Sequence, residues 1–449
     1  MAMTAMDIYK LLPRTNCGEC GTPTCLAFAM QLANKQASLD ACPHASDEAR
    51  DALAAAAEPP ITLVKIGTDD KEIEIGKETV MFRHEETFHN QCAITVCIPD
   101  SATDVDARIE KINALTFERI GDIIGADIVA VEDTDGDAER FASVVQKVLE
   151  GSNQAIMLMS FDPAVVETTF ENVPGLAAAR PLVYGACADN WEAMADLAVK
   201  YDVPLGVYAD GLEPLAELTP KIKEKGVREM VIDSGARDVI SGLTDLTQIR
   251  RQALSNNFRP LGYPAFAFAR GEDEQQVALD ASVYVAKYAG VVVIEGDEPW
   301  QVLPLATLRQ NIYTDPRVPP TVEAKLYEVG EPGADSPVIM TTNFALTYFT
   351  VFNEVEASRV PAWVVVVDTE GQSVLTAYSS ENLSAEIAAK AMAACGIEDK
   401  VNHRDIIIPG YVAVMSGALE EEAGWNVIVG PREATAIPAY LRRLASESG

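Results

Sequence analysis

Four of the eight cysteines in this 449-residue chain stand close together near its beginning. Cys17, Cys20, Cys25 and Cys42 are separated by two, four and sixteen residues, and Pro43 follows the last of them. Short gaps let one loop aim several thiolates at a single point, and soft thiolates bind iron–sulfur clusters or zinc. Structural zinc sites commonly use two paired C-x-x-C units, whereas this stretch has one. The pattern favours a [4Fe–4S] cluster on these four thiolates, with zinc or a disulfide pair as alternatives.

Residues 1–58 are predicted to form a small module around this cluster. The apolar spacing over Cys25–Ala33 is typical of a helix, with Leu26, Met30 and Ala33 on one face. Such a short segment has little core of its own. The cluster is therefore expected to supply much of its folding free energy.

A second helix is predicted over Ser46–Ala57. Ser46 is its expected N-cap, because a serine side chain can accept a hydrogen bond from an unpaired N–H of the first turn. Glu58-Pro59-Pro60 should end this helix and act as a hinge, because proline disfavours a helical conformation before it.

From about residue 91, eight apolar runs alternate with helical stretches, which predicts eight β–α units. The runs are apolar on both faces, as in a sheet that is covered on both sides. Their number and size predict a TIM (β/α)8 barrel over residues 61–315, with a doubly wound sheet as the alternative. The strands expected are Ala93–Ile98, Ile128–Val131, Ala155–Met159, Leu182–Gly185, Pro204–Tyr208, Glu229–Ile232, Ala265–Ala269 and Gly290–Ile294. The helices expected include Ala138–Leu149, Trp191–Val199, Leu212–Lys223 and Glu274–Tyr288. Short antiparallel strands over Thr62–Ile66, Glu72–Ile75 and Thr79–Phe82 are expected to form a lid.

Acidic and amide residues follow several predicted barrel strands, where barrel active sites lie. They are Asp100, Glu132, Asp133, Asp162, Asp189, Asn190, Asp210, Asp233 and Glu295. Such residues also cap helices, and we interpret them as caps or solvated charges rather than catalysts. His84 and His89 are interpreted as surface histidines, and H-E-x-x-H, G-x-S-x-G and Walker A motifs are absent from the sequence.

The charge of the chain argues against two classes of partner. Its 35 Lys and Arg residues and 68 Asp and Glu residues leave a net charge of −33, which disfavours nucleic acid and anionic membranes. The longest apolar runs, such as Ala362–Val367, are too short to cross a bilayer. Residues 1–30 show no signal peptide, and thiolate ligands suit a reducing cytoplasm, so a cytoplasmic location is expected.

After a proline-rich linker over Asn311–Val322, residues 325–449 are predicted to form a small doubly wound α/β domain. Its expected strands are Val338–Thr341, Trp363–Val367, Asp405–Ile408 and Trp425–Val429. Its expected helices are Phe344–Phe352, Ala385–Ala394, Gly410–Glu422 and Ala434–Ser446. Ligands of such sheets bind at the carboxyl ends of the strands.

Small and polar residues stand at those strand ends, where they would let a large flat ligand approach the backbone. They are Thr341-Thr342-Asn343, Asp368–Ser373, Pro409-Gly410 and Gly430-Pro431-Arg432-Glu433-Ala434. Ordinary turns are the alternative. The last stretch could also hold a phosphate at a helix N-terminus, which would suggest a nucleotide or flavin.

The cysteine pattern and three C-terminal stretches together resemble the large subunit of corrinoid iron–sulfur proteins, the gamma subunit of the acetyl-CoA decarbonylase/synthase complex. The stretches are Thr341–Tyr348, Gly371–Tyr378 and Gly430–Ala434. The order of cluster module, barrel and small α/β domain is also similar, so the resemblance covers essentially the whole chain.

This resemblance implies a methyl carrier of the reductive acetyl-CoA (Wood–Ljungdahl) pathway rather than an enzyme acting alone. A cobamide in the C-terminal domain would accept a methyl group as Co(I) from methyl-tetrahydrofolate or another methyl-pterin, through a separate methyltransferase. It would pass the methyl group to acetyl-CoA synthase/carbon monoxide dehydrogenase, and the cluster would reactivate Co(II). The implied partners also include a small corrinoid protein subunit, in a heterodimer, and a low-potential electron donor. The family barrel resembles pterin-binding barrels.

The resemblance also implies which residues contact the corrinoid, while no residue is expected to be catalytic because the cofactor carries the chemistry. The implied residues are Thr341, Thr342, Asn343, Thr347, Gly371, Gln372, Ser373, Val374, Leu375, Thr376, Gly410, Gly430, Pro431, Arg432, Glu433 and Ala434. The domain has one histidine, His403, which lacks the Asp-x-His-x-x-Gly context of a cobalt ligand. A base-off cobamide without protein histidine is therefore expected. An iron–sulfur electron-transfer subunit that binds flavin or nucleotide remains the alternative.

Overall fold

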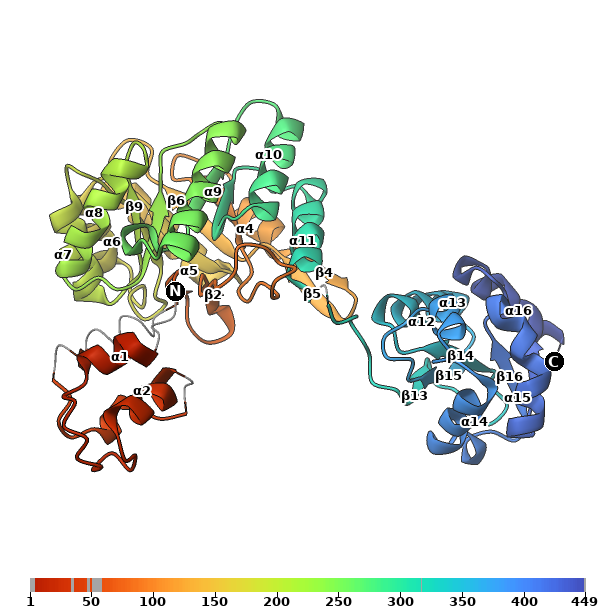
Figure 1. Cartoon of the computed structure of the whole chain (residues 1–449). Helices are drawn as coiled ribbons and strands as arrows, with labels where there is room; N and C mark the ends of the chain where they lie inside the picture. The colour runs from red at the N-terminus through yellow and green to blue at the C-terminus, as the bar shows by residue number, and fades with distance from the viewer. Residues whose placement is uncertain (1–4, 34–35, 47–48, 51–58, 316, 448–449) are drawn as a thin grey trace. The chain divides into compact units, whose positions relative to one another are not determined.

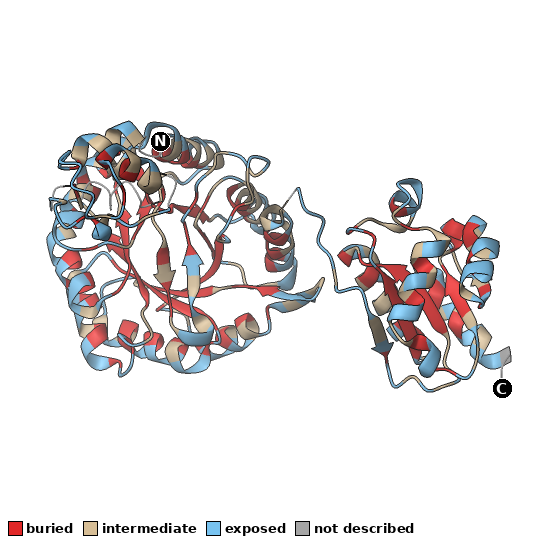
Figure 2. Ribbon diagram, turned by 60° about the horizontal axis from the view of Figure 1, so that its bottom comes forward, coloured by how far each residue is buried: buried red, intermediate tan, exposed pale blue. Residues whose placement is uncertain are grey.

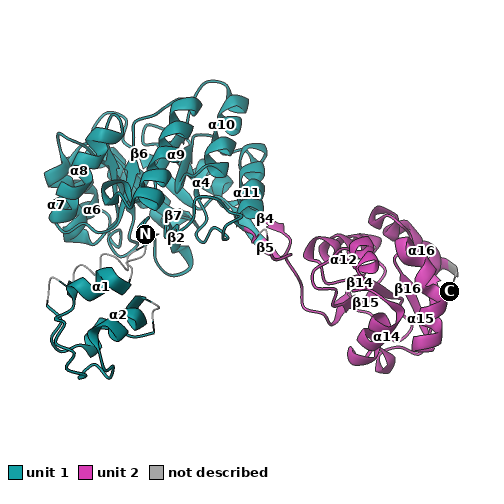
Figure 3. Ribbon diagram, in the orientation of Figure 1, with its two compact units in different colours: residues 1–117, 123–313 teal, residues 118–122, 314–449 magenta. Residues whose placement is uncertain are grey.

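The computed structural model describes residues 5–33, 36–46, 49–50, 59–315 and 317–447. The chain divides into two compact units (Figure 3). The first contains Met1–Phe117 and Ile123–Tyr313, and the second contains Glu118–Asp122 and Thr314–Gly449. Among the described residues, no helix combines the length and the apolar character needed to cross a membrane.

The cysteine module contains α1 (Ala5–Leu11), α2 (Cys25–Ala33) and a 3-10 turn over Leu39–Ala41 (Figure 1). Helix α2 has the predicted bounds, but of the predicted apolar face only Ala33 packs against the core. Leu26 and Met30 are 37% and 54% exposed, whereas Phe28 and Ala29 are buried. The reason is that α2 turns its largest side chain, Phe28, toward α1, where it shares a core with Ile8.

The start of the predicted second helix is described, and its remainder is not. The Ser46 hydroxyl accepts a hydrogen bond from the Ala49 N–H at 3.1 Å, as an N-cap does. Residues 51–58, which include Glu58 of the expected hinge, lie outside the described residues. Pro59 belongs to the barrel, because its carbonyl accepts a hydrogen bond from Arg259 at 2.8 Å.

The predicted barrel is confirmed. In the described part of the first unit, eight parallel strands run in the order β10-β9-β8-β7-β6-β3-β12-β11, and a bridge between Ile232 and Ala265 joins the two ends (Figure 2). The strands are β3 (Ala93–Pro99), β6 (Ile128–Glu132), β7 (Ala155–Met159), β8 (Leu182–Ala186), β9 (Leu205–Tyr208), β10 (Met230–Asp233), β11 (Phe266–Ala269) and β12 (Val291–Ile294). The surrounding helices are α4 (Val105–Asn113), α5 (Ala138–Gly151), α6 (Pro163–Asn172), α7 (Trp191–Tyr201), α8 (Leu212–Glu224), α9 (Val239–Asn256), α10 (Glu274–Ala286) and α11 (Pro299–Tyr313).

Each barrel strand buries both of its faces. On β3, Ala93 and Cys97 belong to the cluster inside the barrel, whereas Ile94, Val96 and Ile98 belong to the cluster shared with the helices. This two-sided burial explains why the sequence shows continuous apolar runs instead of alternation.

A two-stranded lid closes the amino end of the barrel. Strands β1 (Val64–Ile66) and β2 (Ile73–Ile75) pair antiparallel, and Val64, Ile66 and Ile75 belong to the interior cluster. The turn between them binds just before β8, because the Gly67 N–H donates to the Arg180 carbonyl at 2.9 Å.

The third predicted lid strand, Thr79–Phe82, is wrong. Two of its N–H groups donate to the Glu85 carboxylate at 3.2 Å, and the Val80 carbonyl accepts from Arg250 at 3.1 Å. Side chains satisfy this backbone in place of a neighbouring strand. A hairpin that the sequence analysis missed, β4 (Thr116–Arg119) and β5 (Asp122–Gly125), follows α4.

The second unit is a mixed sheet with helices on both faces. Its order is β13-β15-β14-β16-β17, in which β13 is the antiparallel edge. The strands are β13 (Leu326–Val329), β14 (Val338–Thr342), β15 (Ala362–Val367), β16 (Asp405–Ile408) and β17 (Asn426–Val429). The helices are α12 (Ala345–Ser358), α13 (Val374–Ser379), α14 (Ala385–Ala394), α15 (Ser416–Ala423) and α16 (Ile437–Glu447). Met340 and Leu419 share the core on the α15 face, and Ile339 and Leu441 share the core on the α16 face.

Four features in and before this unit differ from the predicted pattern. The edge strand β13 and the short helix α13 were not predicted. The predicted helix over Gly410–Glu422 is broken, because its first part is a 3-10 segment with a non-helical Val412. The linker is shorter than Asn311–Val322, because α11 continues to Tyr313 and the Val322 N–H donates to the Asn343 carbonyl at 2.9 Å.

Candidate functional site

The four clustered cysteines lie in the first module as free thiols. Cys25 and Cys42 are buried in its core, and the half-buried Cys20 packs against the same core. Cys17 is exposed, and its sulfur lies within 4.8 Å of a ring nitrogen of His44, two residues after Cys42. Three of the four thiols therefore share one small core, and the fourth lies beside a residue that closely follows Cys42. Soft donors of this kind are the ligands of iron–sulfur clusters.

The loop that carries the first cysteines is shaped by glycines and by one asparagine. Gly18 and Gly21 have φ of +77° and +82°, a region that favours glycine, and the Gly21 N–H donates to the Gly18 carbonyl at 3.0 Å. The Asn16 side chain accepts from the Cys25 N–H at 2.8 Å, which fixes the loop to the start of α2. A hydrogen bond with the Thr22 hydroxyl lowers the pKa of Cys20 and so favours its thiolate, the form that binds metal.

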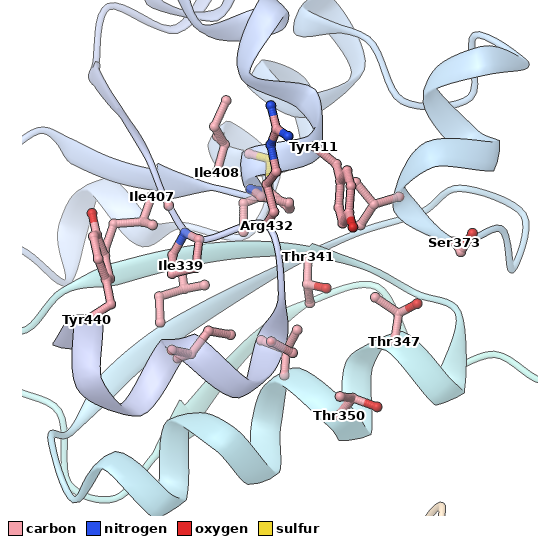
Figure 4. A pocket seen from close by; sticks show the side chains of 18 of the residues that line it. Ile339, Thr341, Thr347, Thr350, Ser373, Ile407, Ile408, Tyr411, Arg432 and Tyr440 are labelled. Carbon is pink, nitrogen blue, oxygen red and sulfur yellow. The ribbon is translucent and has the colours of Figure 1, made fainter.

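A cavity of about 400 Å³ opens at the carboxyl end of the sheet in the second unit (Figure 4). It lies between β14 and β16, which share one register pair, Ile339 with Ile407. The chain goes from β14 to β15 on one side and returns to β16 on the other, so the cavity lies at a topological switch point. Ligands of open α/β sheets bind at such points.

The walls of this cavity are mainly apolar. Ile339 and Ile407 come from the two strands, and Ile437 and Leu441 come from α16. Polar side chains also line it, among them Thr341 of β14, Thr347 and Thr350 of α12, Ser373, Tyr411 and Arg432. An apolar cavity with a few placed polar groups is the usual form of a cofactor site.

The polar residues at the ends of the barrel strands mostly form caps and ion pairs. Asp162 accepts from the Ala164 N–H at 2.8 Å and caps α6, and Asn190 accepts from the Cys187 N–H at 2.7 Å. Asp133 accepts from the Ser160 hydroxyl at 2.7 Å. Four pair with an arginine: Asp100 with Arg140 at 3.0 Å, Glu132 with Arg270 at 2.8 Å, Asp233 with Arg237 at 2.8 Å and Glu295 with Arg270 at 3.4 Å. Asp189 and Asp210 are exposed. Contacts of this kind agree with structural roles.

Comparison with known proteins shows that the cysteine module and the second unit occur together in known relatives. A family model described as CO dehydrogenase/acetyl-CoA synthase delta subunit matches residues 63–441, and a model described as a putative Fe-S cluster matches residues 12–44. The corrinoid/iron-sulfur protein large subunit of Moorella thermoacetica is 45% identical over 444 residues, which cover 98% of this chain and 99% of that protein. The acetyl-CoA decarbonylase/synthase complex subunit gamma of Methanothermobacter thermautotrophicus is 35% identical over 462 residues, which cover 100% of both.

This chain belongs to the corrinoid/iron–sulfur protein large-subunit family. The first family model carries the delta-subunit name, but it begins after the cysteine module, whereas the two relatives match across that module as well. Among solved structures, the dihydropteroate synthase of Thermus thermophilus matches 53% of this large subunit and 100% of its own chain, with 16% identity and a TM-score of 0.39. Because this score is low, the barrel assignment depends on the strand pairing alone.

The cavity of the large subunit contains part of the expected corrinoid-binding set. The residues that line it are Thr341, Thr347, Ser373, Val374, Leu375, Gly430, Pro431, Arg432 and Ala434. The expected residues that stand outside its lining are Thr342, Asn343, Gly371, Gln372, Thr376, Gly410 and Glu433. Pro409, which the sequence analysis named among the strand-end residues, also lines the cavity. The other lining residues were missed, because in the sequence they read as core or helix positions: Ile339, Met340, Leu346, Thr350, Val351, Ile407, Ile408, Tyr411, Ile437, Tyr440 and Leu441.

Asn343 of the large subunit does not line the cavity, but it holds a loop that leads to lining residues. Its side-chain oxygen accepts from the N–H groups of Thr369 and Gly371 at 2.9 and 3.1 Å, and its amide donates to Asp368 at 2.9 Å. These bonds hold the loop after β15 in place. Glu433 likewise accepts a hydrogen bond from the hydroxyl of Tyr411, which lines the cavity.

A single methyl group at Gly410 of the large subunit is expected to disturb the cavity. A Cβ there would lie 2.5 Å from the Gly430 carbonyl oxygen and 2.9 Å from the Arg432 nitrogen, both backbone atoms that would have to move. Gly410→Ala should weaken corrinoid binding by roughly tenfold or more, since overpacking costs about 1–3 kcal/mol. Titration of the full chain with corrinoid checks this. Gly417→Ala, where a Cβ meets nothing within 4 Å, is the matched control and should bind as the parent does.

His403 of the large subunit is held away from the cavity. Its Nε2 lies 3.0 Å from the Ser336 carbonyl oxygen, and its Nδ1 accepts from the Asp405 N–H at 3.2 Å. Both ring nitrogens are thus engaged at the amino end of β16, whereas the cavity is lined by residues from its carboxyl end.

Proposed function

We propose that this large subunit carries methyl groups on the cobalt of a corrinoid bound at the cavity of its second unit. The observation that carries the proposal is this cavity, which lies at the switch point between β14 and β16 in a chain that also carries Cys17, Cys20, Cys25 and Cys42 in one small module. When bound, the corrinoid supplies a cobalt that takes a methyl group from a methyl-pterin through a methyltransferase, gives it to acetyl-CoA synthase and is reduced again when it oxidises.

The chain's own residues have binding tasks in this proposal. The apolar walls from β14, β16 and α16 exclude water, and the hydroxyls of Thr347 and Ser373 would hydrogen-bond the amides around the corrin. The Arg432 guanidinium would lie near the phosphodiester of the nucleotide tail. None of these side chains needs to transfer a proton.

The four thiolates are proposed to hold a [4Fe–4S] cluster that delivers the reactivating electron. One C-x-x-C unit followed by two single, buried cysteines, Cys25 and Cys42, suits a cubane better than a tetrahedral zinc ion. The proposed partners are a small corrinoid protein subunit in a heterodimer, the methyltransferase, acetyl-CoA synthase/carbon monoxide dehydrogenase and a low-potential electron donor.

Purification of the full chain without oxygen tests the corrinoid assignment. The protein should show corrinoid absorption and about one cobalt per chain, together with the iron and sulfide of its cluster. An absorption spectrum of flavin, with no cobalt, would instead support the electron-transfer alternative.

The cobamide is proposed to be base-off, with no histidine on the metal. Because both nitrogens of His403 are engaged by backbone groups, electron paramagnetic resonance of the Co(II) state should show no nitrogen superhyperfine splitting from an axial ligand. His403→Ala should leave that spectrum unchanged. A splitting that disappears in His403→Ala would show that the ligand assignment is wrong.

A further inference from the structure

One hydroxyl in the lining of the cavity is buried without a partner. Thr341 is 1% exposed, and its Oγ1 makes no hydrogen bond among the described residues. Side chains alternate along a strand, so Thr341 lies on the same face of β14 as Ile339, the face covered by α12 and α16. In Figure 4 its side chain stands between the labelled Ile339 and Thr347.

The other polar groups around the cavity have partners or stand nearer to water. Thr350 donates to the Leu346 carbonyl at 2.6 Å, and Ser373 lies 3.1 Å from the Thr376 hydroxyl. Tyr411 donates to Glu433, and Arg432 is exposed. Leaving a buried hydroxyl unpaired costs free energy, so the position of Thr341 points to a ligand atom that completes its hydrogen bonding.

The size and lining of the cavity restrict which part of a cobamide can reach Thr341. A volume of about 400 Å³ is far too small for the whole cofactor, whose corrin ring is broad and surrounded by amides. The nucleotide tail ends in a narrow, flat aromatic base, which suits walls formed by Ile339, Ile407 and Leu441. The charged phosphodiester would remain at the exposed Arg432.

We infer that the Thr341 hydroxyl donates a hydrogen bond to the ring nitrogen of the lower base. This inference rests on the proposed corrinoid function and adds the class of base that the site prefers. In a base-off cobamide this nitrogen does not bind cobalt, and in an apolar cavity it would be a buried acceptor without a donor. Thr341 is a buried hydroxyl without a partner, so each group satisfies the other. The site therefore selects cobamides with a nitrogen-containing base, such as benzimidazole, over cobamides with a phenolic base.

Titration of the full apo chain with three corrinoids, followed by visible absorption, tests this preference. The corrinoids are a benzimidazolyl cobamide, a phenolyl cobamide and cobinamide, which has no nucleotide tail. Thr341→Val keeps the shape of the side chain and removes the donor. It should weaken binding of the benzimidazolyl cobamide about tenfold, the value of one buried hydrogen bond, and change the other two affinities less than about twofold. Thr341→Ser, which restores a hydroxyl, should recover most of the loss.

Thr95→Val is the matched control, because Thr95 of β3 is also fully buried with an unpartnered hydroxyl but belongs to the first unit. It should bind all three corrinoids as the parent does. Both valine variants should unfold at or above the temperature of the parent, since each removes an unpaired buried hydroxyl. Equal weakening of all three corrinoids in Thr341→Val, or no weakening of the benzimidazolyl cobamide, would overturn the inference. If the parent protein binds none of the three corrinoids, both the proposed function and this inference fail.

Discussion

Cys20→Ala protein, purified without oxygen, is expected to lose its iron and sulfide and to keep its corrinoid. Cys20 packs against the same small core as Cys25 and Cys42, and Thr22 favours its thiolate. A cubane with three cysteine ligands is less stable and is readily lost. The cavity lies in the other unit and does not depend on this module for its walls.

The functional consequence should be selective. A low-potential donor should no longer return oxidised cobalt to Co(I) through the protein, so the rate of Co(I) recovery should fall to that of free corrinoid mixed with the same donor. Methyl transfer to cobalt that is already reduced should survive. Rapid mixing with the donor, followed by absorption, measures this recovery. Cys187→Ala, at a half-buried cysteine of the barrel, should behave as the parent. Unchanged recovery in a Cys20→Ala protein without cluster iron would contradict the role of the cluster.

Removal of residues 315–317 is expected to slow the passage of methyl groups between partners by more than about tenfold. In the proposed function the cobalt meets a methyltransferase, acetyl-CoA synthase and the cluster, and one fixed position cannot face all three. Helix α11 ends at Tyr313, and the second unit holds the chain from Pro320 on, because the Pro320 carbonyl accepts a hydrogen bond from the Ala345 N–H at 2.9 Å. Six residues lie between these two points. Six residues span at most about 20 Å, and deletion of three halves that reach.

The comparison requires a control of unchanged length. Replacement of residues 315–317 by Gly-Ser-Gly preserves the reach and should preserve the rate, since a flexible linker of equal length permits the same excursions. Corrinoid content should be equal in all three proteins, because the deletion lies outside the cavity lining. Methyl transfer to both partners at the parent rate in the shortened protein would show that motion about this linker plays no part.

The sequence was most informative where chemistry or periodicity imposes a local pattern. The gaps between Cys17, Cys20, Cys25 and Cys42 predicted one cysteine module, and the structure places Cys20, Cys25 and Cys42 at one small core. That all four bind one cluster stays a prediction. The eight barrel strands were predicted because burial on both faces leaves continuous apolar runs.

The walls of the cavity could not be predicted, because an apolar wall and an apolar core obey the same pattern. Ile339, Ile407 and Leu441 are as buried as core residues and become walls only because β14 and β16 part after one register pair. The buried face of α2 could not be chosen from the sequence for a related reason. Several positions of a short helix are apolar, and the choice between Phe28 and Met30 depends on where α1 packs.

Partners distant in the sequence were also beyond prediction. Glu132 and Arg270 are 138 residues apart and meet at the mouth of the barrel with a distance of 2.8 Å. Thr341 was expected to contact the corrinoid, but no pattern in the sequence indicated that its hydroxyl would lack a protein partner. That feature depends on the packing of α12 and α16 over β14.

Transfer of one isotope-labelled methyl group tests the carrier function most directly. The full chain, loaded with corrinoid and reduced, is mixed with labelled methyl-tetrahydrofolate and the methyltransferase, separated from both, and then mixed with acetyl-CoA synthase. The label should reach the chain in a one-to-one ratio with cobalt, appear on the metal by absorption, and leave when acetyl-CoA synthase is added. Label that binds a chain without cobalt, that attaches to a protein side chain, or that stays after this addition would contradict the carrier function.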